Sequence, residues 1–361
     1  MGTVEQVVIA RRTGFCYGVR EAIDDARLSA GRGRSTATLG QVVHNEGVIA
    51  ELDAHGIATV DSLDQLADGD AVVIRAHGVR PDVMTQARSR GLEVIDGTCT
   101  WVLAEQKAIQ ELVTEGYTIV LLGTRQHPET IGLLGFAPEA IVVDEEEEWD
   151  AIPHRKRMAL ISQSTQPPWK FEKLAAMLVS RSHELKVINS VCPVTIRRQQ
   201  DTMALAAEVD MMVVVGGRSS ANTKELTRLC AMAGVPAHQI EEAGDLTDAA
   251  VFGTARIVGV TGGTSTPIED LGAVAERVYL LAGTDEQRLR AAELAREALA
   301  SVAEQAYRST SIGVPIGNLG AVRQPGEKGR RASGRPSEPA AAAATTGAVS
   351  AGAAPGGIAG R

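Results

Sequence analysis

The sequence predicts an α/β protein made of three small α/β modules with mostly parallel sheets, in a pseudo-threefold arrangement around a common centre. Short apolar runs rich in β-branched residues alternate with helical segments, which is typical of parallel sheets with crossover helices. Cys16, Cys99 and Cys192 recur at spacings of 83 and 93 residues, about one small module each. Within each spacing, and again after Cys192, a strand-like run ends in a polar segment containing glycine, at 75–78, 121–129 and 214–223.

The strand-like runs are nearly continuous apolar stretches that end in glycine or a turn, as expected for strands buried on both faces. We expect strands within the ranges 4–10, 70–76, 92–96, 117–123, 140–144, 158–162, 186–190, 210–217 and 255–260. Helical segments follow them at 18–30, 81–90 and 221–234.

These elements predict module boundaries along the chain. The first module covers 17–98, the second 99–191, and the third combines 1–16 with 192–282. A helical extension is expected at 283–322, in which 284–307 has the pattern of one Ala-rich helix opened by Thr284. Residues 323–361 are rich in Ala, Gly and Pro and carry a net charge of +4, so we expect a disordered tail.

Composition excludes several classes of protein. The formal net charge is −9, of which residues 1–322 carry −13, and this argues against a general nucleic-acid binder. No apolar run approaches the length of a membrane span or of a signal peptide. We therefore expect a cytoplasmic protein without a membrane or nucleic-acid partner, in which the four cysteines are unlinked thiols.

One of the four cysteines is expected to be a core residue, and the other three are candidates for a shared site. No pair has the CxxC spacing, which excludes a zinc ribbon or a thioredoxin-like motif. Cys230 lies on an amphipathic helix, as a buried small hydrophobe does. The other three stand at element boundaries, either as separate core residues or as one metal site. Three thiolates would leave one iron of a four-iron cluster open for chemistry, while zinc fits this pattern less well.

Three histidines occupy matching positions. His44, His77 and His127 each follow a strand-like run and precede Asn, Gly or Pro, at the strand edge where open α/β sheets bind ligands. Glu129 is the acid best placed to deliver protons beside them, the alternative being a solvated loop carboxylate.

Polar clusters at 161–166, 217–223 and 261–267 also follow strand-like runs. Backbone amides with hydroxyl and amide side chains at helix starts suit a small phosphate or diphosphate. No Walker lysine and no dinucleotide fingerprint is present at these sites.

With these residues in view, the chain resembles the LytB family of 4-hydroxy-3-methylbut-2-enyl diphosphate reductases. The resemblance runs from about residue 7 to 282. It rests on the segments TGFCYGV, TLGQVVHN, VIRAHGV, VIDGTC, HPETIGLLG, KVINSVCPVTIRRQ, VVVGGRSSANT and VTGGTSTP, which occur in the family's order.

The resemblance implies one [4Fe-4S] cluster per chain at the centre of the three modules, held by Cys16, Cys99 and Cys192 with one iron open. It implies that Glu129 delivers protons and that Ser164 takes the place of a threonine that orients substrate and water. It further implies substrate binding by these residues: His44, His77, His127, Ser164, Thr165, Ser220, Ala221, Asn222 and Ser265.

The implied reaction is a two-electron reductive dehydroxylation, the last step of the methylerythritol phosphate route to isoprenoids. It yields isopentenyl and dimethylallyl diphosphate, with electrons from ferredoxin or flavodoxin. The sequence departs from the family pattern at Gly97, Thr100, Trp101, Ser164 and Ala221, and none of these changes removes a ligand or the acid.

Two other functions remain open at this point. One is a divergent paralogue that acts as a redox-neutral iron–sulfur hydratase or dehydratase on a related diphosphate. The other is an iron–sulfur sensor whose tail binds a partner, which predicts neither a pocket acid nor polar clusters.

Overall fold

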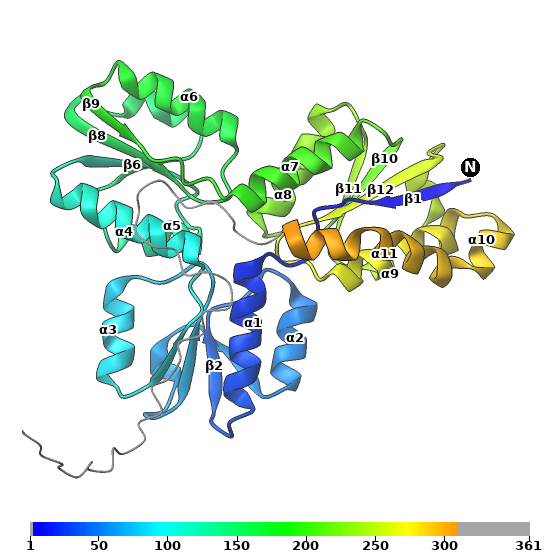
Figure 1. The fold of residues 1–361 in the computed structure, drawn as a ribbon, viewed down its shortest axis with the longest axis horizontal. Helices are drawn as coiled ribbons and strands as arrows, with labels where there is room; N and C mark the ends of the chain where they lie inside the picture. Colours follow the sequence, from blue (N-terminus) through cyan, green and yellow to red (C-terminus); the bar gives the residue numbers. More distant parts are fainter. Residues whose placement is uncertain (1–2, 310–361) are drawn as a thin grey trace, which may run out of the picture. The chain divides into compact units, whose positions relative to one another are not determined.

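The computed structural model describes residues 3–309 and contains three four-stranded sheets whose strand pairs are all parallel (Figure 1). The first sheet has the order β3-β2-β4-β5 and the second β7-β6-β8-β9. The third has the order β11-β10-β12-β1. The prediction of three modules with parallel sheets is confirmed.

The strands are short. Those of the first sheet are β2 (Thr36–Leu39), β3 (Ile57–Val60), β4 (Ala71–Ile74) and β5 (Glu93–Asp96). Those of the second are β6 (Thr118–Leu122), β7 (Ile141–Val143), β8 (Arg155–Ser162) and β9 (Ser182–Val187). Those of the third are β10 (Met211–Val215), β11 (Ala237–Ile240), β12 (Ile257–Gly262) and β1 (Gln6–Ile9).

All three sheets share one topology. Counted along each module, the spatial order is second, first, third and fourth strand. In the third sheet the fourth strand is β1 from the other end of the chain, paired with β12 from Gln6 opposite Ile257 to Ile9 opposite Val260. The N-terminal segment therefore completes the third module, as the sequence predicts. The sheets lie within the predicted module ranges, whose residue boundaries stay a prediction.

Among the described residues, eight helices connect these strands or join one module to the next, and α9 follows β12. They are α1 (Tyr17–Ala30), α2 (Glu46–Ala54), α3 (Pro81–Ser89), α4 (Thr100–Thr114), α5 (Pro128–Leu134), α6 (Pro168–Val179), α7 (Pro193–Ala206), α8 (Ala221–Met232) and α9 (Ile268–Ala282). Short 3₁₀ turns complete the connections at η1 (Leu63–Gln65), η2 (Glu146–Ala151), η3 (Ala243–Asp245) and η4 (Ala249–Phe252).

The strands β2, β3 and β11 are not among the predicted ones. Each has only four residues, and polar residues interrupt the apolar pattern, as in the Thr36–Leu39 sequence TATL. The hydrogen bonds to β3 and β4 on either side establish β2 as a strand. Local sequence carries no such information.

The prediction of one helix over 284–307 is wrong in one respect. Two helices are present, α10 (Asp285–Leu289) and α11 (Ala291–Ser309). Thr284 caps α10 in a capping box with Gln287, whose side chain also donates to the carbonyl oxygen of Glu5 at 2.8 Å. The break at Arg290 lets α10 hold this contact while α11 turns Ala291 and its following apolar residues into the core of the third module. The predicted tail at 323–361 lies outside the described residues.

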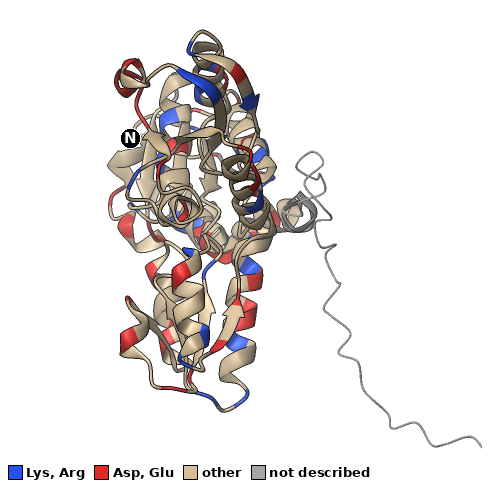
Figure 2. Cartoon of the chain, turned by 90° about the vertical axis from the view of Figure 1, so that its left-hand side faces the viewer, with Lys and Arg blue, Asp and Glu red and all other residues tan. Residues whose placement is uncertain are grey.

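Positions of Lys and Arg and positions of Asp and Glu are interspersed along the ribbon in the view of Figure 2. None of the helices among residues 3–309 is long and apolar enough to cross a membrane.

Candidate active site

The three candidate cysteines share one structural position. Each follows the fourth strand of a sheet and precedes a helix: Cys16 between β1 and α1, Cys99 between β5 and α4, and Cys192 between β9 and α7. Burial raises the pKa of each thiol, and the backbone N–H groups two and three residues further on lower it. Because the first N–H groups of a helix have no partner within the helix, these helix starts favour a negatively charged sulfur.

The cysteine backbones are anchored alike. Each cysteine N–H donates to a carbonyl oxygen in the loop after the third strand of its own sheet: Cys16 to Thr264 at 3.2 Å, Cys99 to Ala76 at 3.0 Å, and Cys192 to Ser164 at 2.8 Å. The three cysteines that recur along the sequence thus make equivalent backbone hydrogen bonds in the three modules.

The three thiols are close enough to interact electrostatically. The Cys99 Sγ atom lies 2.9 Å from the point that a Cβ atom on Gly18 would occupy, so α1 packs directly on Cys99. After burial, charges on Cys16 and Cys192 are the next causes that raise the pKa of Cys99. Cys230 is buried apart from them in another core cluster. Three free thiols whose charges interact, each with helix N–H groups near the sulfur, fit an iron–sulfur cluster, whose ligands are thiolates stabilised by such hydrogen bonds.

Two departures from the family pattern have structural roles. The indole N–H of Trp101, on α4, donates to the carbonyl oxygen of Ser190 at 2.6 Å and so links the Cys99 helix to the segment before Cys192. Gly97 has no space for a side chain, because a Cβ atom there would lie 2.5 Å from the carbonyl oxygen of Ile74.

Arg198 links the other pair of cysteines. It lies on α7, six residues after Cys192, and is 1% exposed. Its guanidinium donates to the carbonyl oxygens of Gly14 at 2.7 Å, Gly262 at 2.8 Å and Gly263 at 2.7 Å. One buried cation therefore holds the loop before Cys16 against the loop after β12.

We expect Arg198→Met to lower the free energy of unfolding by about 3–5 kcal/mol, because it leaves buried carbonyl groups without donors. Arg198→Lys keeps the charge but loses the planar guanidinium with its several N–H donors. Its free energy of unfolding should lie between that of Arg198→Met and that of the parent. Urea unfolding measures the effect, with Arg197→Gln as the control on the neighbouring, less buried position. A parental midpoint for Arg198→Met would contradict the role of this cation.

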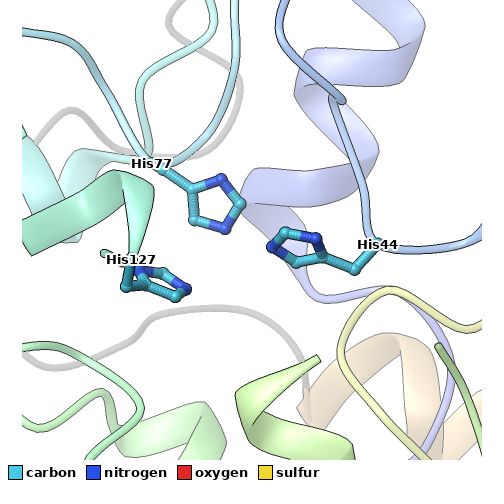
Figure 3. A group of neighbouring side chains, drawn as sticks. All are labelled: His44, His77 and His127. Carbon is cyan, nitrogen blue, oxygen red and sulfur yellow. The ribbon is translucent and has the colours of Figure 1, made fainter. Parts of the chain in front are cut away.

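The histidines form a second group. The ring centroids of His44 and His77 are 5.4 Å apart, those of His77 and His127 are 5.2 Å apart, and those of His44 and His127 are 6.2 Å apart. The rings approach one another from three separate loops (Figure 3). His127 Nδ1 accepts from the backbone N–H of Glu129 at 3.1 Å, which leaves its other nitrogen for the pocket. His77 Nδ1 is buried without a hydrogen-bond partner.

Arg75, which follows β4, gives this group a positive charge. The guanidinium packs on Gly40, where a Cβ atom would lie 2.5 Å from Arg75 Nη1. Burial lowers the pKa of all three histidines, that of His127 to about 4, and Arg75 lowers each further. The ring nitrogens lie within 4.8 Å of one another, close enough to hold a cation. The adjacent guanidinium repels a cation and attracts an anion, so the electrostatics favour a phosphate-type ligand.

Glu129 and Ser164 form a direct pair. Glu129 is 1% exposed, and its carboxylate accepts from the Ser164 N–H at 2.5 Å and the Ser164 hydroxyl at 2.7 Å. Burial raises the pKa of Glu129 to about 7, against the lowering effect of both Ser164 bonds. A carboxyl with this pKa can release and take up a proton near neutral pH.

The polar clusters reach the same region. Gly217 packs on the backbone of His44, whose carbonyl oxygen lies 2.4 Å from the position of a Cβ atom on that glycine. Asn222 is 3% exposed, and neither amide atom has a hydrogen-bond partner among the described contacts. Its Nδ2 atom lies 3.7 Å from the Cβ position of Gly263. The amide of Asn222 is thus an unused donor where two loops meet.

The remaining candidates differ in what they offer a ligand. Ser220 caps α8 by accepting from the N–H of Thr223 at 3.3 Å. Thr165 Oγ1 accepts from Gln163 Nε2 at 2.7 Å. Ala221, the first residue of α8, offers only its backbone N–H, and Ser265 is 8% exposed in the loop after β12. Ligand binding by these residues stays a prediction.

The candidates follow the repeat of the fold. After the first strand of each sheet come His44 in a loop, then His127 with Glu129 at the start of α5, then Ser220 with Asn222 at the start of α8. Loops after the third strand carry His77, then Ser164 with Thr165, then Ser265. Parallel strands bring these loops to one edge of each sheet, the usual place for a ligand.

Sequence reasoning missed three charged residues, the half-buried Arg75 and the buried Arg198 and Glu105. The first two lie within segments singled out for other residues, RAHG and VCPVTIRRQ. Only burial distinguishes them from solvated arginines. Glu105 lies on α4 and is 1% exposed.

The model of the LytB protein family matches residues 7–279. The chain belongs to the LytB family. Among curated relatives, a 4-hydroxy-3-methylbut-2-enyl diphosphate reductase of Geobacter metallireducens is 35% identical over 274 residues, which cover 76% of this chain and 96% of the relative. That of Anaeromyxobacter sp. strain K is 37% identical over 264 residues, covering 72% and 94%.

Solved structures agree with the LytB assignment. A structure of (E)-4-hydroxy-3-methyl-but-2-enyl diphosphate reductase, the terminal enzyme of the non-mevalonate pathway, matches with a TM-score of 0.59 and 33% identity. It covers 77% of this chain and 100% of its own. The E-1-hydroxy-2-methyl-but-2-enyl-4-diphosphate reductase from Plasmodium falciparum matches with a TM-score of 0.70 and 25% identity, covering 74% and 86%. LytB proteins are iron–sulfur enzymes.

Proposed function

We propose that this chain is a 4-hydroxy-3-methylbut-2-enyl diphosphate reductase, which converts its substrate to isopentenyl and dimethylallyl diphosphate by two-electron reductive dehydroxylation. Family membership and the relatives' activity support it. The single observation in the structure that carries it is the equivalent position of three half-buried thiols, each after the fourth strand of a sheet and at the start of a helix. This donor set is the one a cluster with a free iron requires.

Cys16, Cys99 and Cys192 would hold one [4Fe-4S] cluster. Such a cluster supplies electrons and an open iron that acts as a Lewis acid. Helix N–H groups at the sulfurs and the buried Arg198 charge, which lies near Cys16 and Cys192, offset the negative charge of the site.

The diphosphate would lie among His44, His77 and His127, with Arg75 as its counter-charge. An anion there raises the pKa of the rings and strengthens their hydrogen bonds. Ser220, Asn222, Ser265, Thr165 and the Ala221 N–H would supply further donors. The acidic body of the chain makes these local donors necessary, since its net charge repels anions.

Glu129 would deliver protons to the reacting end of the substrate, and Ser164 would orient its carboxyl. Both hydrogen bonds from Ser164 hold the two oxygens in fixed directions. The partners are the allylic diphosphate and a one-electron donor, for which we propose ferredoxin or flavodoxin. We propose a cytoplasmic location.

Arg75→Met should raise KM for the diphosphate about tenfold or more and leave kcat within a few-fold, because loss of an attraction present throughout the reaction weakens binding alone. Steady-state kinetics over a range of ionic strength measure this. Arg88→Gln, on the exposed face of α3, is the control. An unchanged KM in Arg75→Met would contradict binding of the diphosphate next to Arg75.

The function is tested by anaerobic purification, iron and sulfide analysis, and turnover of the hydroxylated allylic diphosphate with and without a reduced mediator. We expect iron and sulfide in the protein and turnover that depends on the mediator. Turnover without reductant would instead indicate the hydratase. A well-folded, colourless and iron-free protein would contradict both.

A further inference from the structure

A second carboxyl lies inside the molecule, on a helix that packs against the helix of the proposed proton donor. Glu105 is 1% exposed, and neither of its oxygens has a hydrogen-bond partner among the described contacts. It lies on α4, which begins after Cys99 and packs against α5, the helix that carries Glu129. Nothing in the proposed function yet uses this group.

The surroundings of Glu105 favour its neutral form. Burial raises its pKa well above the ordinary value, and the charge of Glu129 raises it further. Cys192, across from α4, interacts with the same carboxylate charge. The Trp101 indole, one turn away, opposes the rise, but its N–H is donated to Ser190 and leaves both Glu105 oxygens without a bond. An unpartnered buried carboxylate is costly, so the group keeps its proton.

The proposed reaction needs two protons. For a substrate R–OH the balance is R–OH + 2 e⁻ + 2 H⁺ → R–H + H₂O. The C–O bond breaks and a C–H bond forms. The one-electron donor supplies the electrons in two steps. One proton converts the departing hydroxide to water and the other goes to carbon, whereas Glu129 holds only one proton at a time.

We propose that Glu105 acts through Glu129 as the store of the second proton. After Glu129 has given its proton to the departing oxygen, the carboxylic acid of Glu105 returns one to it, and Glu129 then protonates carbon. The proposal rests on the proposed function. It assigns a role to a buried carboxyl that would otherwise only destabilise the fold.

The test compares Glu105→Gln, which keeps size and polarity, and Glu105→Met, which keeps size alone, with the parent. We expect kcat for the allylic diphosphate to fall about 100-fold in both, with KM and iron content unchanged and a larger solvent isotope effect. Glu111→Gln, on the exposed side of the same helix, is the control and should match the parent. If the parent is active and both Glu105 variants keep its kcat and isotope effect, the role of Glu105 is refuted while the proposed function stands. An inactive parent refutes the proposed function.

A second measurement is independent of turnover. The infrared C=O band of a protonated carboxyl should persist above pH 7, where Glu129 has lost its proton. We expect this band in the parent and in Glu129→Gln, and its loss in Glu105→Gln. If neither Glu105 variant folds, the Glu129→Gln spectrum is sufficient, because a band there cannot come from Glu129. The absence of this band above pH 7 in the parent and in Glu129→Gln overturns the inference.

Discussion

Replacing any one of Cys16, Cys99 and Cys192 by serine should reduce iron and sulfide to background and abolish reduction of the allylic diphosphate. A ligand must be deprotonated to bind metal, and a serine hydroxyl at these positions keeps its proton. The three thiols occupy equivalent places after the fourth strand of each sheet, so the three variants should fail alike. Iron and sulfide analysis with activity measured on the same sample checks this.

Cys230→Ala is the matched control. Cys230 is fully buried in α8 within a separate core cluster, so its loss should cost about 1 kcal/mol of stability through a small cavity. The iron content should match the parent. A Cys99→Ser variant with full iron, or a Cys230→Ala variant without iron, would contradict the ligand assignment.

Glu129→Gln should lower kcat by about 10²–10⁴-fold while iron content stays at the parental level. Glutamine can still accept from the Ser164 N–H, so the local structure is kept, but it has no proton to deliver. The exposed Glu139→Gln serves as the control. Full activity in Glu129→Gln would refute the proton role.

The pH dependence of this variant gives a second check. The pKa of Glu129 is raised from 4.5 to about 7 by burial, so the folded chain binds a proton that the unfolded chain has lost across this window. Stability of the parent therefore decreases as pH rises from about 4.5 to about 7, by about 3 kcal/mol from this group, and is constant beyond. Glu129→Gln lacks this loss, so its stability relative to the parent should rise over the same window. In the parent, activity should fall above about pH 7 as the acid form is lost.

Much of the fold follows from local sequence. Nearly continuous apolar runs such as 210–217 identify strands buried on both faces, and their alternation with helices specifies parallel pairing. Strands in which polar residues interrupt the apolar run were not predicted. Thr36–Leu39 and Ala237–Ile240 are strands because neighbouring strands pair with them, and the bend at Arg290 exists because α11 must reach the core.

The sequence by itself determined the residue types and the order of this site. The chain itself shows cysteines at module spacing, histidines and hydroxyl clusters after strands, and one acid next to a histidine. These residues predict a site because parallel strands bring the loops that follow them to one edge of the sheet. Tertiary structure alone decided which charges are buried. Arg75, Arg198 and Glu105 look like solvated residues in sequence, since burial depends on what packs on them from distant segments. That packing half-buries Arg75 beside the histidines, makes Arg198 a link between two loops, and buries Glu105 so that its pKa rises.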